Sequence, residues 1–356
     1  MATAKPARAA ARTRAGAPAG PHSNPDPERA PERNPGIPLD LAWVRDVRVG
    51  PAVIEQRAAA LAAREPPARD AEAARLLRVV RLLDLTTLSG DDTPRRVARL
   101  AAEARRPLPA ALLRALGQRP GSLGVAAVCV YHRFVGTALR ALEGSGIPVA
   151  AASAGFPHGL GPMSARLAEI EASVEDGALE IDAVTARVHA LTGDWRGLYD
   201  EVRAFRRACG PARLKAILAT GELGTPGRVA RAALVCAMAG ADFVKTSTGK
   251  ERVNATLPAG VTLARILRAY RDRSGHVVGL KAAGGIRTAE QALQWLALLD
   301  EELGEPWAGP HGFRIGASGL LSDVRGRLER LAGAGRGAER PARNRQPARR
   351  APRGRA

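Results

Sequence analysis

The chain has 356 residues, 46% of them apolar, which is enough to bury a sizeable core and excludes disorder of the whole chain. Its 54 lysines and arginines exceed its 35 aspartates and glutamates and give a formal net charge of +19. The apolar runs are shorter than the roughly 20 residues of a membrane-spanning helix, and the three cysteines lack metal-ligand spacing, which excludes a disulfide scaffold.

Both ends of the chain are mixtures of Ala, Arg, Pro and Gly with almost no large apolar side chain. We therefore expect residues 1–36 and 336–356 to be disordered basic tails. The first tail lacks the apolar core of a secretory signal, and the cysteine usage fits a reducing cytoplasm without membrane contact. Residues 37–335 are expected to form one folded domain, with a helical N-terminal extension over 37–77.

The first part of the folded region has the apolar spacing of helices. This spacing predicts helices at 51–64 and 68–83. Thr93 followed by Pro94 is typical of an N-cap with proline in the first helical turn.

Short runs rich in Val, Ile and Ala then alternate with longer amphipathic stretches. We predict eight strands, at 82–88, 124–131, 148–155, 178–184, 213–219, 242–248, 277–282 and 313–317. We predict helices at 133–145, 163–176, 195–208, 225–239, 258–273, 288–303 and 318–332. Apolar strands separated by helices indicate a parallel sheet covered on both faces. Eight such units favour a closed (β/α)8 TIM barrel; an open doubly wound sheet is the alternative, although no G-x-G-x-x-G follows the first strand.

Lysine is rare in this chain. Only five of the 54 basic residues are lysine, and four of them fall between positions 215 and 281. A lysine amine can lose its proton and attack a carbonyl, whereas a guanidinium stays protonated. The distribution indicates that some lysines were kept for amine chemistry; the alternative is that they escaped a coding bias.

Charged side chains fall inside the predicted strands, where burial is costly unless they are paired or functional. Lys245 and Lys281 lie on adjacent strands, and a second ammonium nearby favours the neutral form of an amine. In a TIM barrel such groups meet at the carboxyl ends of the strands. The alternative is that both lysines form salt bridges in the barrel interior, for example with Asp182 or Asp84.

Glycines follow the last two predicted strands. Gly284 and Gly285 stand before one predicted helix, and Gly316 and Ser318 before the next. Backbone N–H groups at such turns can hold an anion, and barrels of this class often bind phosphate there. We predict a phosphate site at these turns. The histidines show no paired spacing, and no metal site is predicted.

Seven strings resemble the deoxyribose-phosphate aldolase family, in that family's order and over roughly residues 78–325. They are DLTTL, AAVCVY, EIDAV, ILATGELGT, DFVKTSTGKERVNAT, GLKAAGGIRTAEQA and FRIGASGLL, of which KTSTGK-x-x-VNAT is highly specific. The resemblance implies a class I aldolase on a TIM barrel, with no cofactor and no metal. Such an enzyme cleaves 2-deoxy-D-ribose 5-phosphate to D-glyceraldehyde 3-phosphate and acetaldehyde.

The resemblance also implies a role for each matching residue. Lys245 would form the Schiff base, Lys281 would favour its neutral amine, and Asp182 would relay protons through a water. The substrate pocket would be lined by Asp84, Thr86, Cys129 and Lys215, and the phosphate would be surrounded by Gly249, Lys250, Gly284, Gly285, Gly316 and Ser318.

Two other hypotheses stay open. Ala186 and Gly319 depart from the family pattern, which allows a related Schiff-base aldolase with a different aldehyde acceptor. The Arg-rich residues 336–356 could instead bind nucleic acid non-specifically through phosphates, but they carry no aromatic side chain for base stacking. We therefore expect a small phosphorylated sugar as the partner and no main role for nucleic acid; a homo-oligomer is left open.

Overall fold

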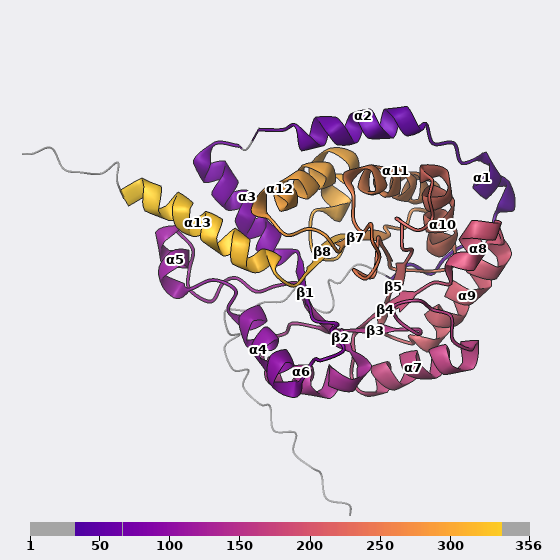
Figure 1. Cartoon of the computed structure of the whole chain (residues 1–356), viewed down its shortest axis with the longest axis horizontal. Helices are drawn as coiled ribbons and strands as arrows, with labels where there is room; N and C mark the ends of the chain where they lie inside the picture. Colours follow the sequence, from indigo (N-terminus) through magenta and orange to yellow (C-terminus); the bar gives the residue numbers. More distant parts are fainter. Residues whose placement is uncertain (1–32, 66, 337–356) are drawn as a thin grey trace, which may run out of the picture.

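The computed structural model describes residues 33–65 and 67–336, which form a barrel ringed by helices (Figure 1). Residues 1–32 and 337–356 lie outside the described residues, and with them nearly all of the two predicted tails.

The centre of the fold is a closed barrel of eight parallel strands in chain order. Strand β8 pairs with β1 to close it, so the prediction of a (β/α)8 barrel is confirmed. The strands are β1 (Leu83–Thr86), β2 (Ala127–Tyr131), β3 (Val149–Ser153), β4 (Glu180–Val184), β5 (Arg213–Ile217), β6 (Phe243–Lys245), β7 (Gly279–Ala283) and β8 (Phe313–Ala317).

Helices surround the strands on all sides (Figure 1). They are α1 (Leu41–Asp46), α2 (Pro51–Ala62), α3 (Arg69–Arg81), α4 (Pro94–Arg105), α5 (Ala110–Ala115), α6 (Val135–Leu142), α7 (Met163–Glu175), α8 (Arg187–Thr192), α9 (Trp195–Ala208), α10 (Pro226–Met238), α11 (Leu257–Ser274), α12 (Ala289–Leu298) and α13 (Leu320–Arg336). Helix α2 of the N-terminal extension lies across α11 and α12, and α3 packs against α12 and α13. Among the described residues, no helix has the length and apolar character to cross a membrane.

Several helices that follow loops at the carboxyl ends of the strands begin at a threonine N-cap. Thr93, Thr225 and Thr256 each accept a hydrogen bond from a backbone N–H in the first turn of α4, α10 and α11, and each of these helices has a proline in its first turn. Thr288 caps α12 in a reciprocal pair with Gln291. Because the caps fix where these helices begin, they also fix the loops that lead into them.

Residues 33–36, which the sequence assigned to the N-terminal tail, are ordered against the barrel. The Asn34 side chain is 3% exposed, and its Nδ2 donates to the carbonyl oxygens of Ala237, 2.7 Å away, and Ala241, 2.9 Å away. Its Oδ1 accepts from the hydroxyl of Tyr270 at 3.0 Å. Residues 33–36 therefore pack against the barrel, because one asparagine satisfies carbonyl groups that the turn between α10 and β6 leaves open.

Candidate active site

The register of the barrel strands brings the predicted charged residues together. Lys245 on β6 pairs with Lys281 on β7, and Asp182 on β4 pairs with Lys215 on β5. The side chains of Asp182, Lys215 and Lys281 are fully buried, and Lys245 is 2% exposed. Several buried charged groups this close together require partners of opposite charge.

Asp182 is the common partner of the lysines. Its Oδ2 lies 2.8 Å from Nζ of Lys245 and 2.7 Å from Nζ of Lys281, and its Oδ1 lies 2.8 Å from Nζ of Lys215. Burial alone would raise the pKa of the Asp182 carboxyl, but the three lysine side chains outweigh burial and hold that pKa well below its ordinary value. The Sγ of Cys129 lies 3.8 Å from the same Oδ2.

A second set of ion pairs lies next to Asp182. Nζ of Lys281 is 2.6 Å from Oδ2 of Asp84, and Nη1 of Arg314 is 2.6 Å from Oδ1 of the same carboxylate. Arg314 Nη2 also contacts Glu180 at 2.8 Å, and Glu180 contacts Nζ of Lys215 at 2.5 Å. The cluster is therefore a closed network of charged side chains inside the barrel.

Opposite charges fix the ionisation of most of this network. Burial lowers the pKa of Lys281, but the carboxylates of Asp182 and Asp84 outweigh it and raise that pKa above its ordinary value. The pKa of Arg314 is raised in the same way, against burial, by Asp84 and Glu180. Burial raises the pKa of the Asp84 carboxyl, but the nearby cations outweigh burial and hold that pKa below its ordinary value.

The charges of the network balance when Lys245 is neutral. Three carboxylates (Asp84, Glu180, Asp182) then face three cations (Lys215, Lys281, Arg314). With Lys245 counted as an ammonium, the cations of the network would exceed its carboxylates by one, and an unbalanced buried charge is costly. The interior salt bridges that the sequence offered as the alternative for the two lysines are present, since Lys245 contacts Asp182 and Lys281 contacts both Asp182 and Asp84.

A cavity of about 320 Å³ opens above Lys245 and Lys281 at the carboxyl ends of the strands. The residues predicted to surround a phosphate all line it, namely Gly249, Lys250, Gly284, Gly285, Gly316 and Ser318. Thr86 also lines the cavity, whereas Asp84, Cys129, Asp182 and Lys215 lie outside its lining. Thr87, Ser89 and Arg287 line it as well, and the sequence did not single them out.

Two of the cavity glycines have close neighbours. Gly284 has a φ of +81°, and a Cβ there would lie 2.8 Å from the side chain of Asn254. A Cβ on Gly316 would lie 3.1 Å from Cε of Lys281, so this glycine leaves room for the lysine stem to pass along β8. Both glycines therefore leave space for a neighbouring side chain, that of Asn254 beside Gly284 and that of Lys281 beside Gly316.

The loop after β6 is held by a carboxylate of the chain itself. Glu251 accepts hydrogen bonds from the backbone N–H groups of Thr248 and Gly249, and Arg187 Nη2 donates to its Oε1 at 3.3 Å. The N–H of Gly249 is thus already engaged. Gly249 itself forms part of the cavity wall.

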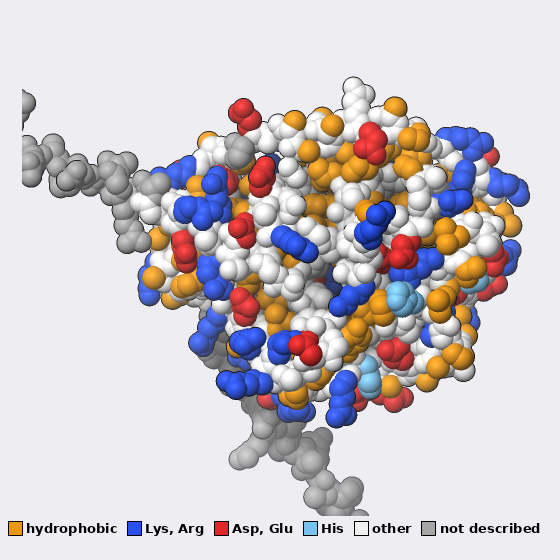
Figure 2. All heavy atoms as spheres, in the orientation of Figure 1, with side chains coloured by type: hydrophobic (Ala, Val, Ile, Leu, Met, Phe, Trp, Pro, Cys, Tyr) orange, Lys and Arg blue, Asp and Glu red, His pale blue; other side chains and the backbone are white. Residues whose placement is uncertain are grey.

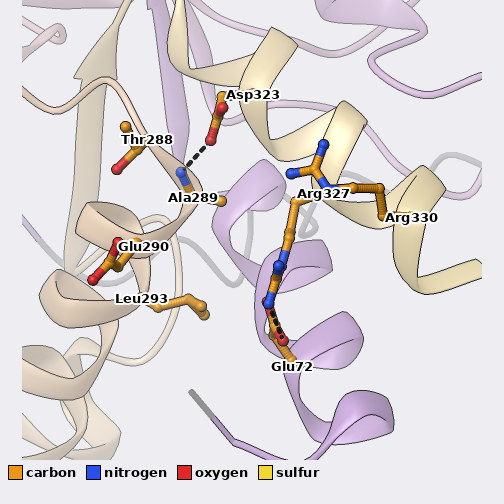
Figure 3. Close-up of a pocket in the computed structure, with 8 residues that line it drawn as sticks. All are labelled: Glu72, Thr288, Ala289, Glu290, Leu293, Asp323, Arg327 and Arg330. Atoms are coloured by element: carbon orange, nitrogen blue, oxygen red, sulfur yellow. Dashed lines mark hydrogen bonds and ion pairs between the residues drawn. The ribbon is translucent and has the colours of Figure 1, made fainter. Parts of the chain in front are cut away.

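A second cavity, of about 360 Å³, lies outside the barrel between α3, α12 and α13 (Figure 3). Three of its charged groups hold these helices together. Arg327 contacts both carboxylate oxygens of Glu72, at 2.6 and 3.0 Å, and Asp323 accepts from the backbone N–H of Ala289 at 2.7 Å. We therefore take the barrel cavity as the candidate active site. The described residues include no group of three or more His, Cys, Asp or Glu placed to hold a metal ion.

Residues 78–318 match the family model described as DeoC/LacD family aldolase. This chain belongs to that family. The deoxyribose-phosphate aldolase of Mus musculus is 51% identical to this family member over 291 residues, which cover 81% of this chain and 92% of the mouse protein. The Homo sapiens deoxyribose-phosphate aldolase is 49% identical over 293 residues, covering 82% and 92% of the two chains.

A solved structure shares the fold of this DeoC/LacD family aldolase. It is the deoxyribose phosphate aldolase of Aeropyrum pernix, described as a unique tetrameric structure, with a TM-score of 0.53 and 23% identity. The match covers 75% of this chain and 100% of that one. At this identity the likeness supports the barrel fold alone.

Sequence reasoning missed two members of the charged network in this DeoC/LacD aldolase. Glu180 and Arg314 stand in the runs EIDAV and FRIGA, where a charge inside an apolar strand marks a paired or functional group. The same signal that points to Asp182 and Lys245 also points to Glu180 and Arg314.

Proposed function

We propose that this chain is a deoxyribose-phosphate aldolase that cleaves 2-deoxy-D-ribose 5-phosphate to D-glyceraldehyde 3-phosphate and acetaldehyde through a Schiff base on Lys245. The observation that carries the proposal is the shared contact of Lys245 and Lys281 with Asp182, below a glycine-lined cavity. The relatives from mouse and human with this name, about half identical to this chain, support the same substrate.

Lys245 is the nucleophile in this mechanism. Its neutral amine attacks the aldehyde carbon of the open-chain sugar and forms a carbinolamine. Lys281, held as a cation by Asp182 and Asp84, donates a hydrogen bond to the developing alkoxide. Loss of water then gives the iminium, which withdraws electrons from the neighbouring carbon–carbon bond.

Asp182 acts as the acceptor in the proton transfers. A water bound by its carboxylate removes the proton from the hydroxyl at C3, the C2–C3 bond breaks, and the electron pair moves to the iminium to form an enamine. D-glyceraldehyde 3-phosphate leaves with its new carbonyl. The enamine is protonated at its carbon, and hydrolysis releases acetaldehyde and the free Lys245 amine.

The phosphate is placed at the turns after β7 and β8. Gly284, Gly285 and Ser318 line this end of the cavity, and Lys250 and Arg287 supply positive charge at its edge. A phosphate held there lies at the opposite end of the substrate from the aldehyde that Lys245 attacks, which matches a five-carbon phosphosugar bound lengthwise.

One observation favours the second candidate, a related aldolase with another aldehyde acceptor. Gly319 lines the cavity without a side chain, and a Cβ built there meets no atom within 4 Å. The space could admit an acceptor of a different shape. Comparing turnover with phosphorylated and unphosphorylated acceptors decides between the two candidates.

We place the enzyme in the cytoplasm, supported by three cysteines that are all buried free thiols. The alternative of nucleic-acid binding concerns residues outside the described ranges. On the face drawn in Figure 2, Lys and Arg side chains intermingle with Asp and Glu around the edge.

The direct test of the function is a cleavage assay on 2-deoxy-D-ribose 5-phosphate in the presence of a chelator. We expect full activity with the chelator and a loss of at least about 1000-fold in kcat for Lys245→Arg, because a guanidinium cannot form the Schiff base. Lys250→Arg, at the edge of the same cavity, is the matched control and should retain kcat. Cleavage that survives Lys245→Arg would contradict the assignment.

A further inference from the structure

An ion pair below the lysines takes no part in the steps above. Nη2 of Arg314 lies 2.8 Å from Oε1 of Glu180, and the two side chains are 3% and 4% exposed. Glu180 is the first residue of β4 and Arg314 the second of β8, so the pair lies near the amino ends of the strands. Neither residue lines the cavity, which excludes direct contact with a substrate bound there.

Two series of ion contacts connect this pair with Lys245. Glu180 contacts Lys215 at 2.5 Å, and Lys215 contacts Asp182 at 2.8 Å. On the other side, Arg314 contacts Asp84, which contacts Lys281, and Lys281 contacts Asp182. Both series therefore end on the carboxylate whose Oδ2 accepts the hydrogen bond of Lys245.

We propose that Glu180 and Arg314 are positioning residues that set the protonation of Lys245 through the charge balance of the barrel interior; this inference rests on the proposed function. Without Arg314, three carboxylates face only two other cations, and an ammonium at Lys245 restores the balance. Without Glu180, the cations already exceed the carboxylates, and the neutral amine is favoured further. The two losses act in opposite directions.

The other groups around Lys245 do not change this charge balance. Cys129 on β2 is a buried thiol whose pKa is raised by burial first and by Asp182 second, so it stays uncharged. The ring of Phe156, after β3, lies 5.9 Å from Nζ of Lys245. The remaining charged groups that face Lys245 are Asp84 on β1, Asp182 on β4, Lys215 on β5 and Lys281 on β7, with Lys250 and Arg287 at the edge of the cavity.

The test measures the pH dependence of kcat/KM for Glu180→Gln, Arg314→Met and the double variant. Arg314→Met should move the ascending limb of the profile up by about one pH unit, because tenfold less Lys245 is then neutral at a given pH. Glu180→Gln should move it down, and the double variant, which restores the charge balance, should return it close to wild type. Arg314→Lys keeps the charge and should keep the position of the limb even where kcat falls.

A control pair separates this effect from the loss of any buried ion pair. Arg166 and Glu201, 2.6 Å apart and 5% and 2% exposed, contact no member of the cluster. Arg166→Met combined with Glu201→Gln should lower thermal stability without moving the limb. The proposal is overturned if the ascending limb of the pH profile stays in place in both Glu180→Gln and Arg314→Met. It is also overturned if the limb moves in the same direction in the two variants.

A second readout does not depend on the aldolase reaction. The rate at which acetic anhydride labels Lys245, followed by mass spectrometry across pH, reports the neutral amine directly. The labelling profiles should shift in the same opposite directions in the two single variants. If they do so while the wild-type protein cleaves no deoxyribose phosphate, the proposed function fails and the charge-balance inference stands; unshifted labelling profiles overturn the inference alone.

Discussion

Asp182 shows how one residue organises the ion pairs of the barrel interior. Its two carboxylate oxygens contact the amines of Lys215, Lys245 and Lys281, and this sharing is what keeps all of these side chains in a dry interior. The sequence alone identified these four residues, because a charge inside an apolar strand is costly unless it has a partner or a role. It did not identify how the charges balance, since that depends on which side chains touch across the barrel.

A prediction at the residue scale concerns Gly284. Substituting alanine would place a Cβ 2.8 Å from Asn254 on a backbone with a φ of +81°, so the turn after β7 must shift. We expect Gly284→Ala to raise KM for 2-deoxy-D-ribose 5-phosphate by about tenfold and to change kcat much less, because the turn lies at the end of the cavity where we propose that the phosphate binds. Steady-state kinetics check this.

Gly319→Ala is the matched control for that substitution. Gly319 lines the same cavity, but a Cβ there meets nothing within 4 Å, so we expect KM close to wild type. Equal effects of the two substitutions would show that the turn at Gly284 has no special part in binding the substrate.

At the scale of elements, the apolar runs predicted all eight strands, and the longer helices followed from their amphipathic spacing. The sequence did not single out α1, α5 and α8, each of which has only six residues. An element of this length makes fewer than two helical turns, which is too short for a periodic pattern to stand out. The packed segment at 33–36 was missed because one buried asparagine holds it, and composition does not show such contacts.

That segment gives a prediction at the scale of elements. Asn34→Ala removes the donors to Ala237 and Ala241 and the acceptor for Tyr270, and it leaves those groups unsatisfied in a buried place. We expect the free energy of unfolding to fall by about 2–4 kcal/mol, measured by chemical denaturation. Arg33→Met, which loses an exposed hydrogen bond to the carbonyl of Gly210 and a longer one to the carbonyl of Ala212, should cost less than about 1 kcal/mol. A loss for Asn34→Ala no larger than this control would contradict the account.

For the whole molecule, the buried network makes stability depend on pH. The fold lowers the pKa of the Asp84, Glu180 and Asp182 carboxyls, because the cations around them outweigh burial. Their contribution to stability is therefore complete above the carboxyl pKa of the unfolded chain, about 4, and is lost as the pH falls below it. The pKa of Lys281 is raised, so its contribution holds below the ordinary lysine pKa of about 10.4 and is lost above it.

Chemical denaturation at several pH values tests this dependence. We expect the free energy of unfolding to fall by at least about 3 kcal/mol between about pH 5 and about pH 3. Full stability down to about pH 3 would show that protonation of the buried carboxylates costs no free energy of unfolding. That result would contradict their ion pairs with the buried cations.

The most direct test of the central claim is to trap the Schiff base. The protein is incubated with acetaldehyde and borohydride, and the modified peptide is located by mass spectrometry. We expect a reduced two-carbon adduct on Lys245, and none on that peptide in Lys245→Arg, because this amine lines the cavity and is the proposed nucleophile. An adduct on Lys281 or Lys250 with Lys245 unmodified would contradict the account.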